Sequence, residues 1–122
     1  MELRNRDRDA MPFTTKDGST VREYLHTEAQ SLAEASLAPD SATRRHYHAR
    51  SEEIYLVVSG TLQFKLDDDV VDVPAGTVVR VAPHVVRSVW NEGPDDVELV
   101  IAAMKIDDPA GDAELVPDFW PV

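Results

Sequence analysis

The chain has 122 residues, which is enough for one domain with a hydrophobic core and too few for two. Its formal charge of -11 argues against nucleic acid and anionic membranes as partners, and no apolar run is long enough to span a bilayer. The sequence has no cysteine, which excludes disulfides and thiolate chemistry, and its charged start is unlike a secretory signal, so we expect a cytoplasmic protein.

The first third of the chain contains one clear strand and one ambiguous segment. Residues 1–12 carry alternating charges without an apolar period, which predicts a flexible N-terminus. A turn is expected at residues 16–19, followed by a strand over residues 20–25, where polar and apolar residues alternate. Residues 27–38 are rich in helix formers, so local propensity alone predicts a helix there.

The most informative stretch begins at His46. His46 and His48 are separated by one residue, so on a strand their side chains point to the same face. Glu53 follows after four residues, a gap long enough for the chain to turn and re-enter as a second strand. Two imidazoles and a carboxylate that converge form a site suited to a divalent transition metal, with Fe, Mn, Ni, Cu and Zn all compatible.

The rest of the chain is predicted to consist of short strands and turns. Such strands at even spacing indicate an all-β sandwich or barrel, here a single domain over residues 13–106. Residues 107–122 contain three prolines and are expected to form an irregular tail, with Phe119 and Trp120 packing on the barrel or on a partner subunit. The expected strands cover residues 54–58, 62–66, 70–73, 77–81, 85–90 and 97–104.

Four residues at fixed spacing resemble the first motif of the cupin superfamily. One residue separates His46 from His48, four residues separate His48 from Glu53, and six residues separate Glu53 from Gly60. The resemblance implies an antiparallel double-stranded β-helix, also called a jelly-roll barrel. In small cupins the segment before the histidines is usually a strand, so we expect a strand over residues 31–37 in spite of its helix propensity. Proteins of this type usually form dimers, and a homodimer that binds a small-molecule ligand is therefore expected.

The second cupin motif, between Gly76 and Asn91, departs from the family pattern. The alignment puts Arg87 where the third metal-binding histidine would stand, and arginine has no lone pair to give a metal. In one interpretation His46, His48 and Glu53 hold the metal alone, and Arg87 binds an anionic group of the substrate.

Two other interpretations of Arg87 stay open. His84 could move in from the preceding turn as a replacement ligand, although it lies an odd number of residues from Arg87 and would face the other way on a regular strand. Alternatively, Arg87 pairs with Glu53 and replaces the metal, which would make the protein a non-catalytic small-ligand-binding module.

Tyr55 shares the face of Glu53 and is expected to line the pocket and contact the substrate. The resulting hypothesis is a metal-dependent enzyme that acts on a small anionic substrate, with oxygenase-type chemistry favoured over isomerase-type chemistry by the ligand set. The sequence assigns no catalytic residue, and the metal-free binding module remains the alternative.

Overall fold

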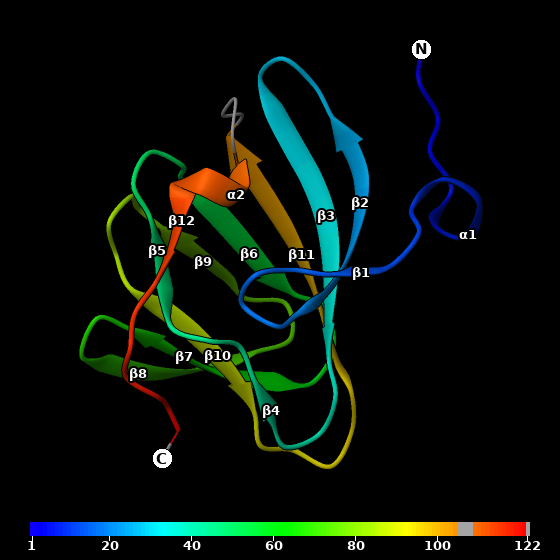
Figure 1. Cartoon of the computed structure of the whole chain (residues 1–122). Helices are drawn as coiled ribbons and strands as arrows, with labels where there is room; N and C mark the ends of the chain where they lie inside the picture. The colour runs from blue at the N-terminus through cyan, green and yellow to red at the C-terminus, as the bar shows by residue number, and fades with distance from the viewer. Residues whose placement is uncertain (105–108, 122) are drawn as a thin grey trace.

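The computed structural model describes residues 1–104 and 109–121, and in these ranges the strands form two antiparallel sheets (Figure 1). This arrangement confirms the predicted all-β antiparallel sandwich. The first sheet has the order β1 (Phe13–Thr14), β2 (Thr20–His26), β3 (Gln30–Leu37), β11 (Val97–Met104), β6 (Glu53–Val57) and β9 (Val78–Val81). The second has the order β12 (Ala113–Leu115), β5 (His46–His48), β10 (Arg87–Asn91), β7 (Thr61–Leu66) and β8 (Asp69–Pro74), with β4 (Ser41–Ala42) paired to β10.

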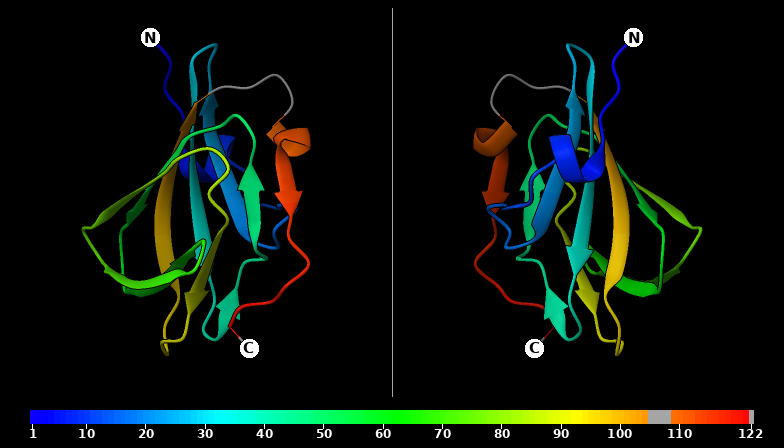
Figure 2. Two further views of the ribbon diagram at one scale, coloured as in Figure 1. Left: turned by 90° about the vertical axis from the view of Figure 1, so that its left-hand side faces the viewer. Right: turned by 90° about the vertical axis from the view of Figure 1, so that its right-hand side faces the viewer.

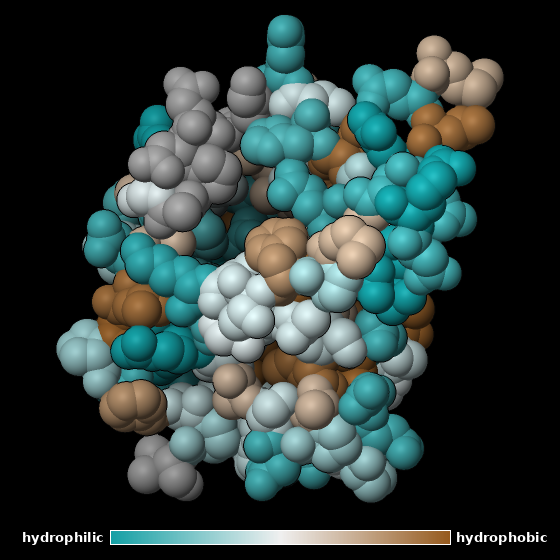
Figure 3. Space-filling model, turned by 45° about the vertical axis from the view of Figure 1, so that its right-hand side comes forward, coloured by the Kyte–Doolittle hydropathy of each residue, from teal (hydrophilic) through white to brown (hydrophobic). Residues whose placement is uncertain are grey.

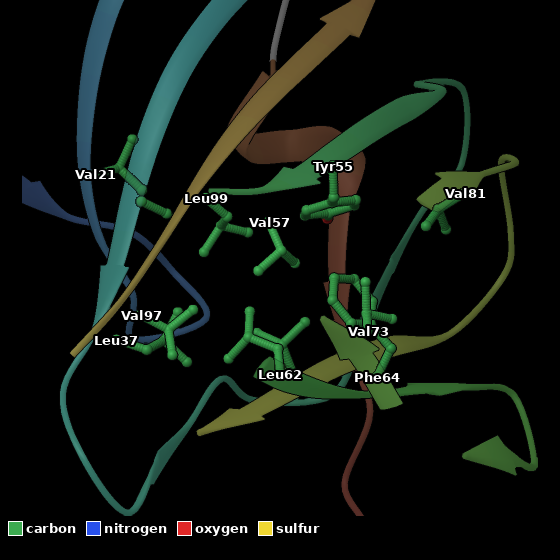
Figure 4. Packing of buried hydrophobic residues seen from close by; sticks show 12 residues of the cluster. Val21, Leu37, Tyr55, Val57, Leu62, Phe64, Val73, Val81, Val97 and Leu99 are labelled. Atoms are coloured by element: carbon green, nitrogen blue, oxygen red, sulfur yellow. The ribbon is translucent and has the colours of Figure 1, made fainter. Parts of the chain in front are cut away.

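The hydrophobic core lies between the two sheets. Leu62 and Phe64 of β7 are fully buried, while Gln63 between them faces away, as the alternation of the sequence predicts. Figure 4 shows these two side chains opposite Val57 of β6 and Leu99 of β11, which belong to the same buried cluster. The inward face of each strand therefore supplies the core and leaves the outward face to solvent.

The segment with conflicting signals is a strand. β3 pairs with β11 along its whole length, from Gln30 opposite Met104 to Leu37 opposite Val97, and also pairs with β2 on its other edge. Two flanking strands supply backbone partners on both sides, and this tertiary context overrides the helix propensity of the segment. The predicted strand over residues 31–37 is confirmed.

Both ends of the chain contain short elements that the sequence did not predict. A one-turn helix, α1 (Arg6–Asp9), follows the N-cap residue Asn5, and Arg6 forms an ion pair of 3.0 Å with Glu34 of β3. In the tail, α2 (Pro109–Asp112) leads into β12, which lies beside β5 at the edge of the second sheet (Figure 2). Residues 105–108, where the predicted barrel ends and its tail begins, lie outside the described residues.

The aromatic tail lies on the outer surface of the barrel. Trp120 packs edge-to-face on Trp90 of the same barrel, with ring centroids 6.0 Å apart, whereas Phe119 is 73% exposed. The face in Figure 3 shows hydrophilic residues around smaller hydrophobic patches. Among the described residues, no helix has the length and apolarity needed to cross a membrane, and the cytoplasmic location stays a prediction.

Candidate metal and ligand site

A cavity of about 460 Å³ lies between the sheets, and residues from both of them line it. The β1–β2 turn bounds one side, because it reaches across to the second sheet, where the Arg44 amide donates to the carbonyl of Asp17 at 2.8 Å. Five of the residues singled out in the sequence line this cavity: His46, His48, Glu53, Tyr55 and Arg87.

The three predicted metal ligands converge as expected. β5 presents His46 and His48 on one face, and Glu53 begins β6 in the opposite sheet. One donor atom of each residue lies within 4.8 Å of the others. Donors bound to one ion at about 2.0–2.2 Å lie roughly 3–3.6 Å apart. The 3.4 Å between His48 Nε2 and Glu53 Oε1 already fits this spacing, and the wider donor separations would have to shorten on metal binding.

Each imidazole has its Nδ1 atom directed toward a protein oxygen. His46 Nδ1 lies 2.9 Å from the carbonyl oxygen of Arg44, and because a carbonyl only accepts hydrogen bonds, Nδ1 carries the proton. His48 Nδ1 lies 3.4 Å from Asp112 Oδ2, within ion-pair distance but without a hydrogen bond among the described residues, and His48 Nε2 lies 3.4 Å from Glu53 Oε1. In this arrangement the Nε2 atoms are the ones free to bind a metal.

The protonation of His48 also suits metal binding. Burial lowers the pKa of His48 below its ordinary value, and the nearby charge of Arg87 acts in the same direction, whereas Glu53 opposes them. The neutral form of the imidazole is therefore favoured, and this is the form that binds metals.

The hydroxyl group of Tyr55 is hydrogen-bonded to Glu53. Its hydroxyl donates a hydrogen bond of 2.7 Å to Glu53 Oε1, and burial raises the pKa of Tyr55 well above its ordinary value. The hydroxyl thus stays protonated and orients the carboxylate. The sequence predicted Tyr55 as a substrate contact; the structure places it in the cavity wall with its polar atom already bonded.

Arg87 is the least satisfied polar residue of the cavity. Its side chain is 1% exposed, Nη2 donates to the carbonyl of Ala82 at 3.3 Å, and Nε lies 3.9 Å from Glu53 Oε1. Nε and Nη1 have no hydrogen-bond partner among the described residues. A buried donor without a partner costs about 1–3 kcal/mol, so these two nitrogens are well placed to bind an anion.

His84 does not join the donor group. Its ring lies against Tyr47, with centroids 6.0 Å apart, and it is not among the residues that line the cavity. His84 lies in the turn before β10 with a positive φ of 68°, so the turn, and not the alternation of a strand, sets the direction of its side chain. Replacement of the third histidine by His84 is therefore not supported.

Two acidic residues near the histidines were missed in the sequence. Asp17 Oδ2, from the β1–β2 turn, lies 3.7 Å from His46 Nε2. The buried Asp112 carboxylate accepts the backbone amides of Arg50 at 3.0 Å and Ser51 at 3.1 Å, in addition to its contact with His48. Both residues lie far from the histidines in sequence, and no local spacing could have connected them.

Comparison with known proteins agrees with the motif. The family model described as Cupin domain matches residues 33–103. An uncharacterized protein of Methanocaldococcus jannaschii is 38% identical over 87 residues, which cover 67% of this chain and 70% of that protein.

Several solved structures have the same fold. A Streptomyces Pac13 variant with uridine has a TM-score of 0.78 at 18% identity, covering 95% of this chain and 90% of that one. KdgF from a Halomonas species has a TM-score of 0.75 at 16% identity, covering 88% and 97%. A predicted oxalate decarboxylase from Thermotoga maritima has a TM-score of 0.71 at 21% identity, covering 86% and 100%. These similarities confirm the predicted double-stranded β-helix, and with the family match they show that the chain belongs to the cupin domain family.

Proposed function

We propose that the protein is a metal-dependent enzyme that acts on a small anionic molecule. A divalent transition metal would be held by His46, His48 and Glu53, and the anionic group of the substrate by Arg87. The observation that carries this proposal is the orientation of the imidazoles, since each has Nδ1 beside an oxygen and Nε2 available to the cavity. Three protein ligands leave coordination positions open for substrate.

Each remaining group has a role in this proposal. The Arg44 carbonyl orients His46 and Tyr55 orients Glu53 through hydrogen bonds, and Asp112 would orient His48 from 3.4 Å away. Arg87 orients the substrate through charge-assisted hydrogen bonds. The metal would supply Lewis acidity or oxygen activation. The set of two histidines and one carboxylate favours oxygenase-type over isomerase-type chemistry.

One observation favours a second candidate function. The ion pair of 3.9 Å between Arg87 and Glu53 fits a cavity in which Arg87 takes the place of the metal. The protein would then be a non-catalytic module that binds a small ligand. A metal-free cavity gives no reason for two oriented imidazoles, so we rank this function second.

Metal analysis separates the two candidates. Wild-type protein, purified untagged and without chelator, is measured by plasma mass spectrometry beside His46→Ala and His84→Ala. We expect near-stoichiometric metal in the wild type and in the His84→Ala control, and its loss in His46→Ala. A folded wild type with little metal would overturn the enzyme proposal in favour of the binding module.

We also propose that the protein forms a homodimer through the outer face of the first sheet. Leu32, Ile54 and Val78 project outward from β3, β6 and β9 and are 43%, 41% and 57% exposed. Ala102 pairs with both Leu32 and Ile54, so Leu32, Ala102 and Ile54 belong to one row across the sheet. Apolar surface of this kind is commonly covered by a second copy in a two-fold dimer.

A further inference from the structure

The cavity has a polar end and an apolar wall, and together they restrict the ligand. Resting on the proposed role of Arg87 as the anion-binding residue, we propose that the ligand is a monocarboxylic acid with an apolar body, such as an arylalkanoic or branched aliphatic acid. Sugar acids and nucleosides, which carry several hydroxyl groups, fit this cavity less well.

The apolar wall comes from the inward face of the first sheet. Ala33 of β3 pairs with Ile101 of β11, and Ala35 pairs with Leu99, so the four side chains form two adjacent rows. All four line the cavity. The alanines leave space that larger residues would fill, and none of these side chains can bond to a ligand hydroxyl. A hydroxylated ligand would lose hydrogen bonds to water along this wall without replacing them.

Many of the polar lining residues are already bonded to other protein groups. In the β1–β2 turn, Asp17 accepts hydrogen bonds from the hydroxyls of Thr15 and Ser19. Lys16 Nζ donates to the carbonyl of Ala113 at 2.9 Å, and the Thr43 hydroxyl accepts from the amide of Val89 at 3.1 Å. The bonds that these groups already make reduce the number of donors and acceptors left for the hydroxyls of a sugar.

The polar end selects the charge of the ligand. Arg87 Nε and Nη1 are buried donors without a partner in the described part of the chain, and a carboxylate would supply a charged acceptor for one of them. Glu53 lies 3.9 Å from Arg87 and Asp17 lies 3.7 Å from His46, so two carboxylates are already present nearby. The ammonium group of Lys16 also lines the cavity, but it is already bonded to a backbone carbonyl. A phosphate dianion would be repelled more strongly than a monoanion, and we therefore favour a carboxylate.

The two features lie on opposite sheets. Arg87 belongs to β10 of the second sheet, whereas the alanine wall belongs to the first. A ligand held by Arg87 therefore extends its body toward the apolar wall. The cavity of about 460 Å³ is within the usual range of small-molecule sites, about 300–1,000 Å³.

Calorimetric titration of the wild-type protein as purified tests the ligand class. The probes are 3-phenylpropionate, its neutral analogue 3-phenylpropanol, glucuronate and uridine. We expect 3-phenylpropionate to bind at least ten times more tightly than each of the other three. Equal or tighter binding of glucuronate or uridine would overturn the inference, and so would equal binding of 3-phenylpropanol.

A matched pair of variants tests where the ligand body lies. Ala33→Leu fills the apolar wall, whereas Ala42→Leu makes the same change at an exposed alanine of β4 that does not line the cavity. We expect at least tenfold weaker binding of 3-phenylpropionate to Ala33→Leu and unchanged binding to Ala42→Leu. Equal affinities of the two variants would contradict the assignment. If Ala33→Leu does not fold, Ala33→Val replaces it with less added volume.

Metal content, measured on the same samples, keeps this inference separate from the proposed enzyme function. Stoichiometric metal without a preference for the apolar acid would refute the inference and leave the enzyme proposal standing. Tight binding of 3-phenylpropionate to metal-free wild-type protein, lost in Arg87→Gln, would support the inference and refute the enzyme proposal.

Discussion

Arg87 Nε lies 3.9 Å from Glu53 Oε1, close enough for an ion pair but without a hydrogen bond between the two side chains. The carboxylate instead accepts its hydrogen bond from Tyr55. Glu53 therefore faces two possible cationic partners, the guanidinium of Arg87 and a metal held with the histidines. The balance between these partners decides what the cavity can do.

Replacing Arg87 by histidine should shift that balance toward the metal. The substitution removes a buried positive charge and adds a lone pair beside the three donors. We expect Arg87→His to bind Zn²⁺ at least ten times more tightly than the wild type in a competition titration with a chromophoric chelator. Arg80→His, at an exposed arginine paired with Glu52, is the control and should not change the affinity. Unchanged affinity in Arg87→His would mean that Arg87 does not face the donors.

Asp112 should support metal binding through His48. Carboxylates that orient a ligating histidine typically contribute about 10–100-fold to metal affinity. We expect Asp112→Ala to lower the Zn²⁺ affinity by about that factor, measured by the same titration. Asp118→Ala is the control, because it removes the ion pair with Arg45 and neither residue lines the cavity. An equal effect of both substitutions would show that general destabilisation, and not positioning of His48, is responsible.

Local patterns predicted the parts of the structure that obey local rules. The alternation of Leu62, Gln63 and Phe64 fixed the inward face of β7, and the single residue between His46 and His48 fixed their common direction. These features depend only on the two-residue period of a strand, so they can be read without knowing the fold.

Other features required the tertiary structure. The residues of β3 favour a helix, and only pairing with β2 and β11 makes them a strand. Asp17 and Asp112 reach the histidines from a turn and from the tail, and their own sequence surroundings contain no ligand pattern. The missing partners of Arg87 also depend on where its neighbours lie in space.

The lowered pKa of His48 predicts a pH dependence of stability in the metal-free protein. Burial is the main cause of the lowered pKa, and a histidine in the unfolded chain has a pKa of about 6.5. Between that value and the lower folded pKa the unfolded state binds more protons, so the free energy of unfolding falls as the pH falls. The contribution of one histidine has a slope of at most about 1.4 kcal/mol per pH unit.

Urea denaturation with chelator at pH 7.5, 6.5 and 5.5 measures this contribution. We expect the wild type to lose more stability than His48→Gln over this range, because the variant lacks the titrating group. The comparison cancels the other histidines, which both proteins share. Parallel stability profiles of the two proteins would contradict the prediction.

The proposed dimer makes a separate prediction. A charge at Ile54 would be buried in the interface without a partner, so Ile54→Glu should sediment as a monomer under conditions where the wild type sediments as a dimer. Val71→Glu makes the same change at an exposed valine of β8 and should leave the dimer intact. Analytical ultracentrifugation checks both variants, and a monomeric wild type at tens of micromolar protein would refute the proposal.

Gly60, the glycine of the first motif, should tolerate substitution less well than Gly76. Both have a positive φ, 74° and 84°, so alanine at either position should cost about 1–2 kcal/mol in backbone strain. A Cβ on Gly60 would also lie 2.8 Å from Cγ2 of the buried Val97, whereas a Cβ on Gly76 would have no atom within 4 Å among the described residues.

The extra contact adds an overpacking cost of about 1–3 kcal/mol to Gly60→Ala alone. Urea denaturation of the two variants measures the difference in the free energy of unfolding. The double variant Gly60→Ala/Val97→Ala removes the clashing methyl groups, so the two substitutions should cost less together than the sum of their separate effects. Equal losses in Gly60→Ala and Gly76→Ala, or additive effects in the double variant, would show that the approach of Val97 does not constrain this position. The expected result would explain the glycine by its close packing against β11, in addition to the conformation of the turn.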